Sequence, residues 1–184
     1  MATNKFNVFE TCNVAAVRYA ERILDVKCDT DVENGTFGYV EIDDTNDIKT
    51  FKKGFKAGCQ VLVADAPAWD LDMVNAPNHS AVRRDKFIIK ADTPFRAITV
   101  KKGDTYATAI EGVTTESQSL MKKNAYVTID TTTGKLVAKA TTTSDAVFEA
   151  IVDKERLHGG LIETTAHNYG YARKMYEYTV KKLA

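Results

Sequence analysis

Short runs of apolar, β-branched and aromatic residues, separated by polar turns, follow one another along nearly the whole chain. Runs of this length and composition are typical of β-strands. In Gly38–Ile42, Tyr39 and Glu41 fall on one face and Val40 and Ile42 on the other, which is the pattern of a half-buried strand. Gln60–Ala64 is apolar after its first residue, which predicts a strand buried on both faces. The remaining runs are Val14–Tyr19, Arg22–Lys27, Phe87–Lys90, Phe95–Val100, Thr105–Thr108, Ala125–Asp130, Lys135–Lys139, Val147–Val152 and Lys174–Val180.

The number and close spacing of these runs predict a mainly β protein, an antiparallel β-barrel or sandwich with short helices and an extended N-terminal arm. The 22 threonines agree with this, because β-branched residues favour a pleated, half-exposed surface. Thr131–Gly134 lies between two of the runs and ends in glycine, which predicts a hairpin there. The segment Thr115–Met121 is the clearest helical signal and predicts one or two turns.

The segment Asp31–Tyr39 contains a strong turn signal, Asn34-Gly35. These two residues can adopt the positive φ angles of a type I′ turn, whose twist matches the strands of a hairpin. The sequence therefore predicts a hairpin in which Tyr19–Lys27 pairs with a strand that begins at Thr36 or Phe37.

A length of 184 residues suits one domain, here residues 10–184, with residues 1–9 set apart as an arm. Phe6, Val8 and Phe9 are apolar, and we expect them to pair with a neighbouring subunit; the alternative is an ordinary first strand of the same subunit. The polar stretch Ala66–Asn78 has a proline near each end and contains the single tryptophan, Trp69. It is interpreted as a surface excursion.

Bulk charge and thiol content limit the partners and the compartment. With 25 basic and 25 acidic residues the formal net charge is zero, so electrostatics favours neither nucleic acid nor an anionic membrane as a partner. Neither a signal peptide nor an apolar run long enough for a membrane helix is recognisable. The odd set Cys12, Cys28 and Cys59 predicts free thiols in a chain made in the reducing cytosol.

No catalytic, metal or cofactor motif is complete. A calcium loop counted from Asp29 would need glycine at its sixth position and glutamate at its twelfth, where Asn34 and Val40 stand. The acidic stretches Asp29–Glu33 and Asp43–Asp47 are therefore read as solvated turns, with calcium binding as the alternative. The three histidines lack zinc-ligand spacing, and His79 and Ser80 lack a nucleophile elbow. We expect no enzyme, no metal and no cofactor.

Four segments, in order, resemble a known family. Asp31–Tyr39 resembles the D-x-E-N-G-x-x-G-Y stretch of small proteins encoded beside the major capsid protein of tailed bacteriophages. Phe95–Tyr106 resembles their central stretch, Lys122–Val127 with Gly134–Lys139 resembles their late hairpin, and Phe148–Glu155 resembles a strand that follows it. Asn124 and Ala150 stand where the family pattern has glycine.

The resemblance implies a capsid decoration protein on the exterior of the virion head, where it strengthens the shell. Its partners would be the major capsid protein and further copies of itself, for example in a trimer. Phe6, Val8, Phe9 and Trp69 are the predicted interface residues. Two alternatives remain open: another virion component, such as a tail-tube or head-fibre module, and a carbohydrate-binding module that uses the aromatic residues of Tyr169–Tyr178 and the acidic turns.

Overall fold

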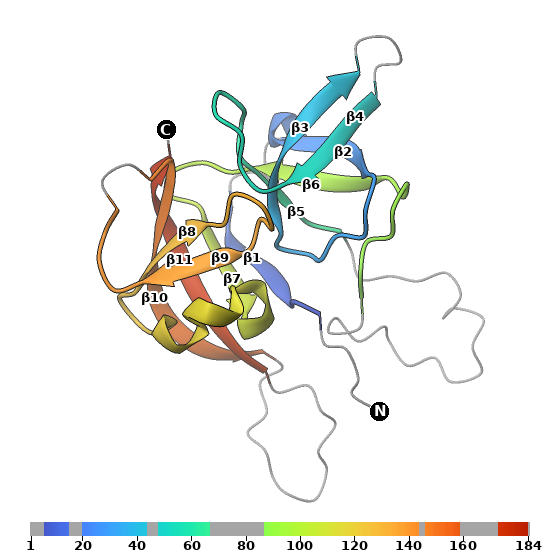
Figure 1. Cartoon of the computed structure of the whole chain (residues 1–184). Coiled ribbons are helices and arrows are strands. Elements are labelled where there is room, and N and C mark those ends of the chain that lie inside the picture. The colour runs from blue at the N-terminus through green and yellow to red at the C-terminus, as the bar shows by residue number, and fades with distance from the viewer. Residues whose placement is uncertain are drawn as a thin grey trace, which may run out of the picture.

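The computed structural model describes residues 6–14, 20–43, 48–66, 87–143, 146–158 and 173–183. These residues form two β-sheets joined by loops, and their helical turns are short 3-10 helices (Figure 1). The predicted mainly β fold, with a barrel and few helices, is confirmed.

The first sheet is a closed five-stranded barrel in the order β2-β4-β3-β5-β6. Its strands are β2 (Ile23–Cys28), β3 (Phe37–Asp43), β4 (Ile48–Lys53), β5 (Leu62–Ala64) and β6 (Phe95–Thr99). The strand β2 closes the barrel, because it pairs antiparallel with β6 and parallel with β4. The predicted hairpin between β2 and β3 is therefore wrong: β4 lies between these two strands.

The second sheet has six antiparallel strands in the order β1-β7-β11-β10-β8-β9. The strands β10 (Phe148–His158) and β11 (Arg173–Leu183) form its long central pair. The strands β8 (Tyr126–Ile129) and β9 (Leu136–Lys139) form the predicted hairpin, which is confirmed. On the other side lie β7 (Thr105–Ala109) and β1 (Phe9–Asn13).

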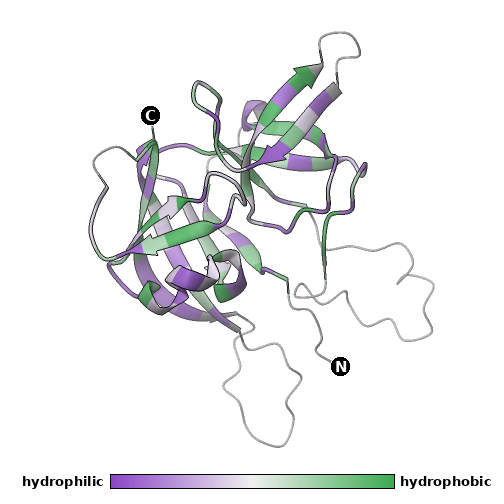
Figure 2. Ribbon diagram, in the orientation of Figure 1, coloured by the Kyte–Doolittle hydropathy of each residue, from purple (hydrophilic) through white to green (hydrophobic). Residues whose placement is uncertain are grey.

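One hydrophobic core lies between the barrel and the sheet, and a second lies within the barrel. The alternation of β5 shows why both exist: Val63 belongs to the core shared with the sheet, whereas Leu62 and Ala64 belong to the barrel core. The prediction that this strand is buried on both faces is confirmed. In Figure 2, hydrophobic and hydrophilic residues alternate along strands of both sheets, as expected when one face of each strand is buried.

The outer edge of β9 is covered by the chain's own short helices. The helices η4 (Ile110–Gly112) and η5 (Thr115–Leu120) precede β8, and η5 confirms the predicted helical turns. Thr114, between the two helices, donates its amide hydrogen to the Leu136 carbonyl at 2.8 Å. Ser117, within η5, accepts a hydrogen bond from the Ala138 amide at 3.0 Å through its hydroxyl. This edge is therefore blocked against pairing with another strand.

The segment predicted to be an N-terminal arm is built into the fold where the structure describes it. The strand β1 pairs with β7 of the same chain, and the Val8 carbonyl accepts a hydrogen bond from the Ala109 amide at 2.9 Å. Phe9 stacks on Tyr106 with their ring centroids 5.5 Å apart. This is the arrangement of the alternative interpretation, a first strand of the same subunit. Residues 1–5 lie outside the described part.

Candidate functional site: the junction between barrel and sheet

The turn Glu33–Thr36 lies where the barrel meets the sheet. The Thr36 amide donates to the Glu33 carbonyl at 3.2 Å, and Gly35 has a φ of +79°. Asn34 is not among the residues with positive φ, so the turn has one left-handed position, its third, as in a type II turn. The predicted type I′ geometry is wrong. The turn is hydrogen-bonded to β5. The Gly35 amide donates to the Ala64 carbonyl, and the Ala64 amide donates to the Thr36 carbonyl.

Asn34 fastens this turn to the segment that follows β5. Its side-chain oxygen accepts from the Ala66 amide at 2.9 Å, and its side-chain nitrogen donates to the Ala66 carbonyl at 2.8 Å. The two bonds imitate the pairing between neighbouring strands. Only a side chain that both donates and accepts can make this pair, which explains why asparagine suits the position.

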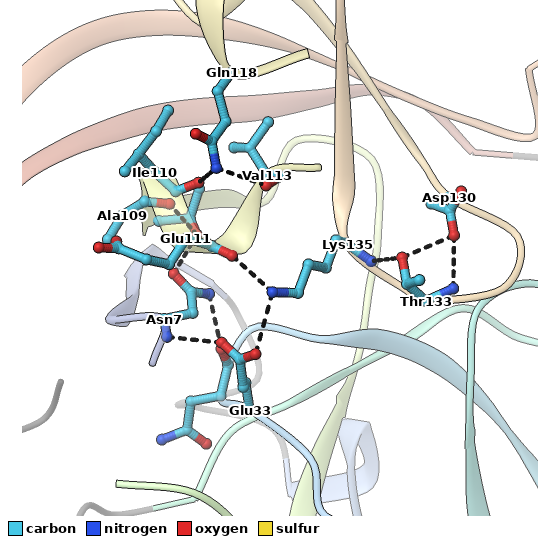
Figure 3. Close-up of polar contacts among 12 residues, drawn as sticks. Asn7, Glu33, Ala109, Ile110, Glu111, Val113, Gln118, Asp130, Thr133 and Lys135 are labelled. Atoms are coloured by element: carbon cyan, nitrogen blue, oxygen red, sulfur yellow. Dashed lines mark hydrogen bonds and ion pairs between the residues drawn. The ribbon is translucent and has the colours of Figure 1, made fainter. Parts of the chain in front are cut away.

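Glu33 and Lys135 connect the turn to the sheet (Figure 3). The Glu33 carboxylate accepts from the Asn7 amide at 2.8 Å and lies 3.1 Å from the Lys135 ammonium. The same ammonium donates to the Glu111 carbonyl at 2.9 Å. The N-terminal segment, the turn, η4 and the loop between β8 and β9 are thus held together by charged and polar groups. We call this set, with Asn34–Phe37, Gly54 and Asp130–Gly134, the junction.

Asn7 is a buried polar residue of the junction whose hydrogen bonds join three segments. Its side-chain nitrogen donates to the Asn34 carbonyl at 2.8 Å, and its side-chain oxygen accepts from the Thr108 hydroxyl at 2.9 Å. With its backbone amide bound to Glu33, the residue links the turn to β7. Sequence reasoning missed it, because an isolated asparagine between apolar residues of the N-terminal segment carries no local signal of its distant partners.

We expect Asn7→Ala to lower the free energy of unfolding by roughly 1–3 kcal/mol, since it leaves buried partners without their hydrogen bonds. Asn13→Ala is the matched control: Asn13 ends the strand β1 that follows Asn7 and is exposed, so its replacement should change stability by less than about 0.5 kcal/mol. Urea unfolding of the three proteins measures both values. Equal effects of the two substitutions would contradict the role given to Asn7.

The loop between β8 and β9 docks on the barrel through its backbone. The Phe37 amide donates to the Gly134 carbonyl at 2.8 Å, and the Phe55 amide donates to the Thr131 carbonyl at 3.2 Å. Gly134 has a φ of +70°, and a Cβ atom there would lie 2.0 Å from the Phe37 carbonyl oxygen. Glycine is therefore required for this close approach. The glycine at the loop's end was a sequence signal for a turn, but its contact with the barrel was not predictable from it.

The Asp130 carboxylate shapes this loop through hydrogen bonds, which also shift its own pKa. Its carboxylate accepts from the Thr133 amide and hydroxyl and from the Thr132 amide, at 2.6, 2.8 and 3.0 Å respectively. These bonds, the Thr133 amide first, lower the pKa of the Asp130 carboxyl below its usual value. Because the pKa is lower in the folded state, the stabilisation is present above the unfolded-state pKa of about 3.9 and is lost as pH falls through the folded-state pKa.

Asp130→Asn should therefore flatten the acid limb of the stability curve. We expect its free energy of unfolding to fall less than that of the unsubstituted protein as pH is lowered from about 5 to about 2. The measurement is denaturant unfolding at a series of pH values, with an NMR titration of Asp130 itself. An unchanged acid limb together with an unshifted titration would contradict the assignment.

A buried ion pair forms a second link between the barrel and the sheet. Arg22, at the end of η2 (Ala20–Arg22), pairs with Asp104 just before β7, and both side chains are less than a tenth exposed. The Arg22 guanidinium also donates to the Thr99 carbonyl at 2.7 Å, and the Tyr106 hydroxyl donates to Asp104 at 3.0 Å. Burial, together with the neighbouring Asp104 carboxylate, raises the pKa of Tyr106 well above its usual value. The phenol stays protonated and donates throughout the physiological range.

A groove of about 340 Å³ opens beside the junction. Its apolar wall includes Phe55, Ile129 and Phe148, and its polar lining includes Thr128, Lys139 and Thr143. The Lys139 ammonium donates to the Thr143 hydroxyl at 3.1 Å. The groove has the size of a small ligand site, but its hydroxyls and single ammonium do not make a nucleophile–base pair.

The predicted interface residues fall into three groups. Val8 and Phe9 are buried in the core, so these two are not exposed anchors in the described structure. Phe6 is half-buried. Trp69 lies outside the described residues, as does nearly all of Ala66–Asn78. The large hydrophobic residues that are exposed in the described part are Ile42, in β3, and Leu120, at the end of η5.

The first acidic turn is neutralised by lysines. The Asp29 carboxylate lies 2.6 Å from the Lys52 ammonium, and the Asp31 carboxylate 2.8 Å from the Lys90 ammonium. These ammonium groups lower the pKa values of both carboxyls. Among the described residues, no three His, Cys, Asp or Glu side chains gather as a metal site would require. Most of the second acidic stretch, residues 44–47, lies outside them.

The comparisons with known proteins return no relatives. No family model matches the chain, and no curated protein and no solved structure is significantly similar to it. Within the described ranges, no helix is both long and apolar enough to span a membrane.

Proposed function

We propose that this protein is a structural component of a tailed-phage virion that binds the outside of the head and stabilises the capsid lattice. It acts without a cofactor, and its partners are the major capsid protein and further copies of itself. The observation that carries the proposal is that the segments resembling phage decoration proteins, distant in sequence, contribute to one hydrophobic core, and that the first of them contacts the late hairpin and the last segment directly.

The first segment contacts two of the others directly, and the central segment shares their core. The Phe37 amide, from the first segment, donates a hydrogen bond to the Gly134 carbonyl of the late hairpin. The Phe37 ring lies 5.1 Å from that of Phe148, centroid to centroid, at the start of the last segment. Tyr106, which ends the central segment, belongs to the same hydrophobic core. The resembling segments therefore include residues that hold the barrel on the sheet.

The two departures from the family pattern are also accommodated. Asn124 has a φ of +65°, the left-handed conformation that glycine adopts most readily and that asparagine tolerates better than most residues. Ala150 is fully buried where the register of β10 against β11 shifts, and alanine is the next smallest side chain after glycine. Both substitutions preserve the geometry that glycine would provide.

A decoration protein gains strength from multiplicity. If an oligomer contacts several capsid subunits at once, weak individual contacts combine into high avidity without any new kind of contact. A barrel and a sheet locked by polar and charged links suit this role, because a rigid body loses little conformational entropy on binding.

Co-sedimentation with undecorated heads tests the proposal. The resemblance implies a major capsid protein encoded beside this chain, and heads assembled from that protein should carry the purified chain into the pellet. They should then resist heat or denaturant better than bare heads. Protein that stays in the supernatant at all concentrations would overturn the proposal.

Trp69→Ala should weaken this binding at least about tenfold, since truncation of a buried aromatic anchor commonly costs about 2 kcal/mol or more. Leu120→Ala is the control, because Leu120 is an exposed hydrophobic outside the predicted interface set. Both variants are compared by the concentration at which half of the head sites are filled. Loss of binding in the control but not in Trp69→Ala would remove tryptophan from the interface.

The alternatives give different results in solution. Light scattering that shows a hexamer or a helical polymer would favour a tail-tube protein, whereas a monomer, dimer or trimer favours decoration. The carbohydrate-binding alternative loses two of its aromatic residues, because Tyr176 and Tyr178 are buried and cannot stack on a sugar. Tyr169 and Tyr171 lie outside the described residues, and a glycan array without hits would remove this alternative.

A further inference from the structure

The pair Asn34-Gly35 is required by the fold at both positions. Asn34 makes the two hydrogen bonds to Ala66 that fasten the turn. Gly35 has a positive φ, and a Cβ atom there would lie 2.6 Å from the Phe9 ring and 2.7 Å from the Asn7 side-chain nitrogen. It is the single Asn-Gly pair in the sequence.

This pair has a chemical liability of its own. The glycine amide nitrogen can attack the preceding side-chain amide, and glycine hinders this ring closure less than any other residue because it has no side chain. For this chain, a bond would form between the Gly35 nitrogen, which loses its proton to water or hydroxide, and Asn34 Cγ. The bond from Cγ to Nδ2 would break and ammonia would leave. Water would then open the cyclic imide to aspartate or isoaspartate.

The junction opposes each requirement of this attack. The Gly35 N–H donates to the Ala64 carbonyl at 2.8 Å, so the proton that must be lost is held in a hydrogen bond and shielded from water or hydroxide. Both polar atoms of the Asn34 side chain are bound to Ala66, which holds Cγ in the strand-like pairing and away from the Gly35 nitrogen. Attack therefore needs the loss of three hydrogen bonds, and the packing of Phe9 on Gly35 resists the necessary movement.

We propose that Asn34 is a latent deamidation site, which the closed junction protects and which reacts when the junction opens. The reaction would also hinder closure afterwards. Both products carry a carboxylate in place of the amide, so the bond donated to the Ala66 carbonyl is lost. Isoaspartate in addition lengthens the backbone beside Gly35, where no space is free. Modified chains are thus a lasting record of junction opening.

Mass spectrometry tests this on the full chain. The protein is incubated at mildly alkaline pH in buffer and, separately, in concentrated urea, with a synthetic peptide of residues 29–39 in both solutions as the unprotected reference. Tryptic fragments locate the gain in mass, and separation of isomers identifies isoaspartate. We expect the folded chain to react at least about tenfold more slowly than the peptide, because its reaction is limited by local opening of the junction. The unfolded chain should react at the peptide's rate.

Two folded variants sharpen the test. Phe9→Ala, or Asn7→Ala if the first fails to fold, loosens the junction and should raise the rate severalfold, whereas Ile42→Ala changes an exposed side chain and should leave it unchanged. A folded chain that reacts as fast as the peptide would overturn the proposal. So would a peptide and an unfolded chain that do not react at all.

Discussion

Gly134→Ala is expected to lower the free energy of unfolding by about 3 kcal/mol or more, because a left-handed φ and a forced backbone contact act together. The new Cβ atom would lie 2.0 Å from the Phe37 carbonyl oxygen and 3.0 Å from the Gly54 amide nitrogen. Neither atom belongs to a flexible side chain, so the loop between β8 and β9 must move off the barrel. Urea or thermal unfolding of the purified variant measures the loss.

Gly58→Ala separates the two causes. Gly58 has a φ of +81°, similar to that of Gly134, but a Cβ atom there would meet nothing within 4 Å. Its replacement should cost only about 1–2 kcal/mol, the price of the left-handed conformation alone. If both variants lost the same stability, the contact between loop and barrel would not be structurally important.

Arg22→Leu is expected to lower the free energy of unfolding by about 3–5 kcal/mol, since it leaves the Asp104 carboxylate buried without its counter-charge. Asp104 would keep the hydrogen bonds from the Lys101 amide and the Tyr106 hydroxyl, but these do not replace a guanidinium. The Thr99 carbonyl would also lose its donor.

The control for this substitution is an exposed ion pair. Lys90 pairs with Asp31 at 2.8 Å, but both side chains are largely exposed, and Lys90→Leu should cost less than about 1 kcal/mol. Replacing both Arg22 and Asp104, by leucine and asparagine, should recover part of the loss, because no unpaired charge is then buried. A double variant as unstable as the sum of the single variants would contradict this explanation.

Local patterns predicted the elements of this fold better than their partners. The hairpin of β8 and β9, the turns of η5 and the two-sided burial of β5 follow from short-range patterns, and the structure confirms them. The hairpin expected at Asn34-Gly35 is wrong because turn chemistry specifies only that the chain reverses. Closure of the barrel decided the partners of β2. This strand pairs with β4 and β6, which are distant from it in sequence.

The junction could be predicted only in part. Its glycines and Asn34 stand out in the sequence as turn residues, and the resemblance singled out the same segments. Asn7 and Lys135 gave no such signal, nor did Arg22 of the separate buried ion pair, because each acts through a partner distant in sequence. Phe9 was expected to anchor a neighbour, since an apolar residue near a terminus looks the same whether it packs on its own chain or on another.

Electron cryo-microscopy of heads with and without the added protein tests the proposed function most directly. We predict extra density on the outer surface of the shell, repeated at equivalent lattice positions, into which the barrel and the six-stranded sheet fit as one rigid body. A shell whose outer surface is unchanged, or density confined to the tail tube, would contradict the assignment as a decoration protein.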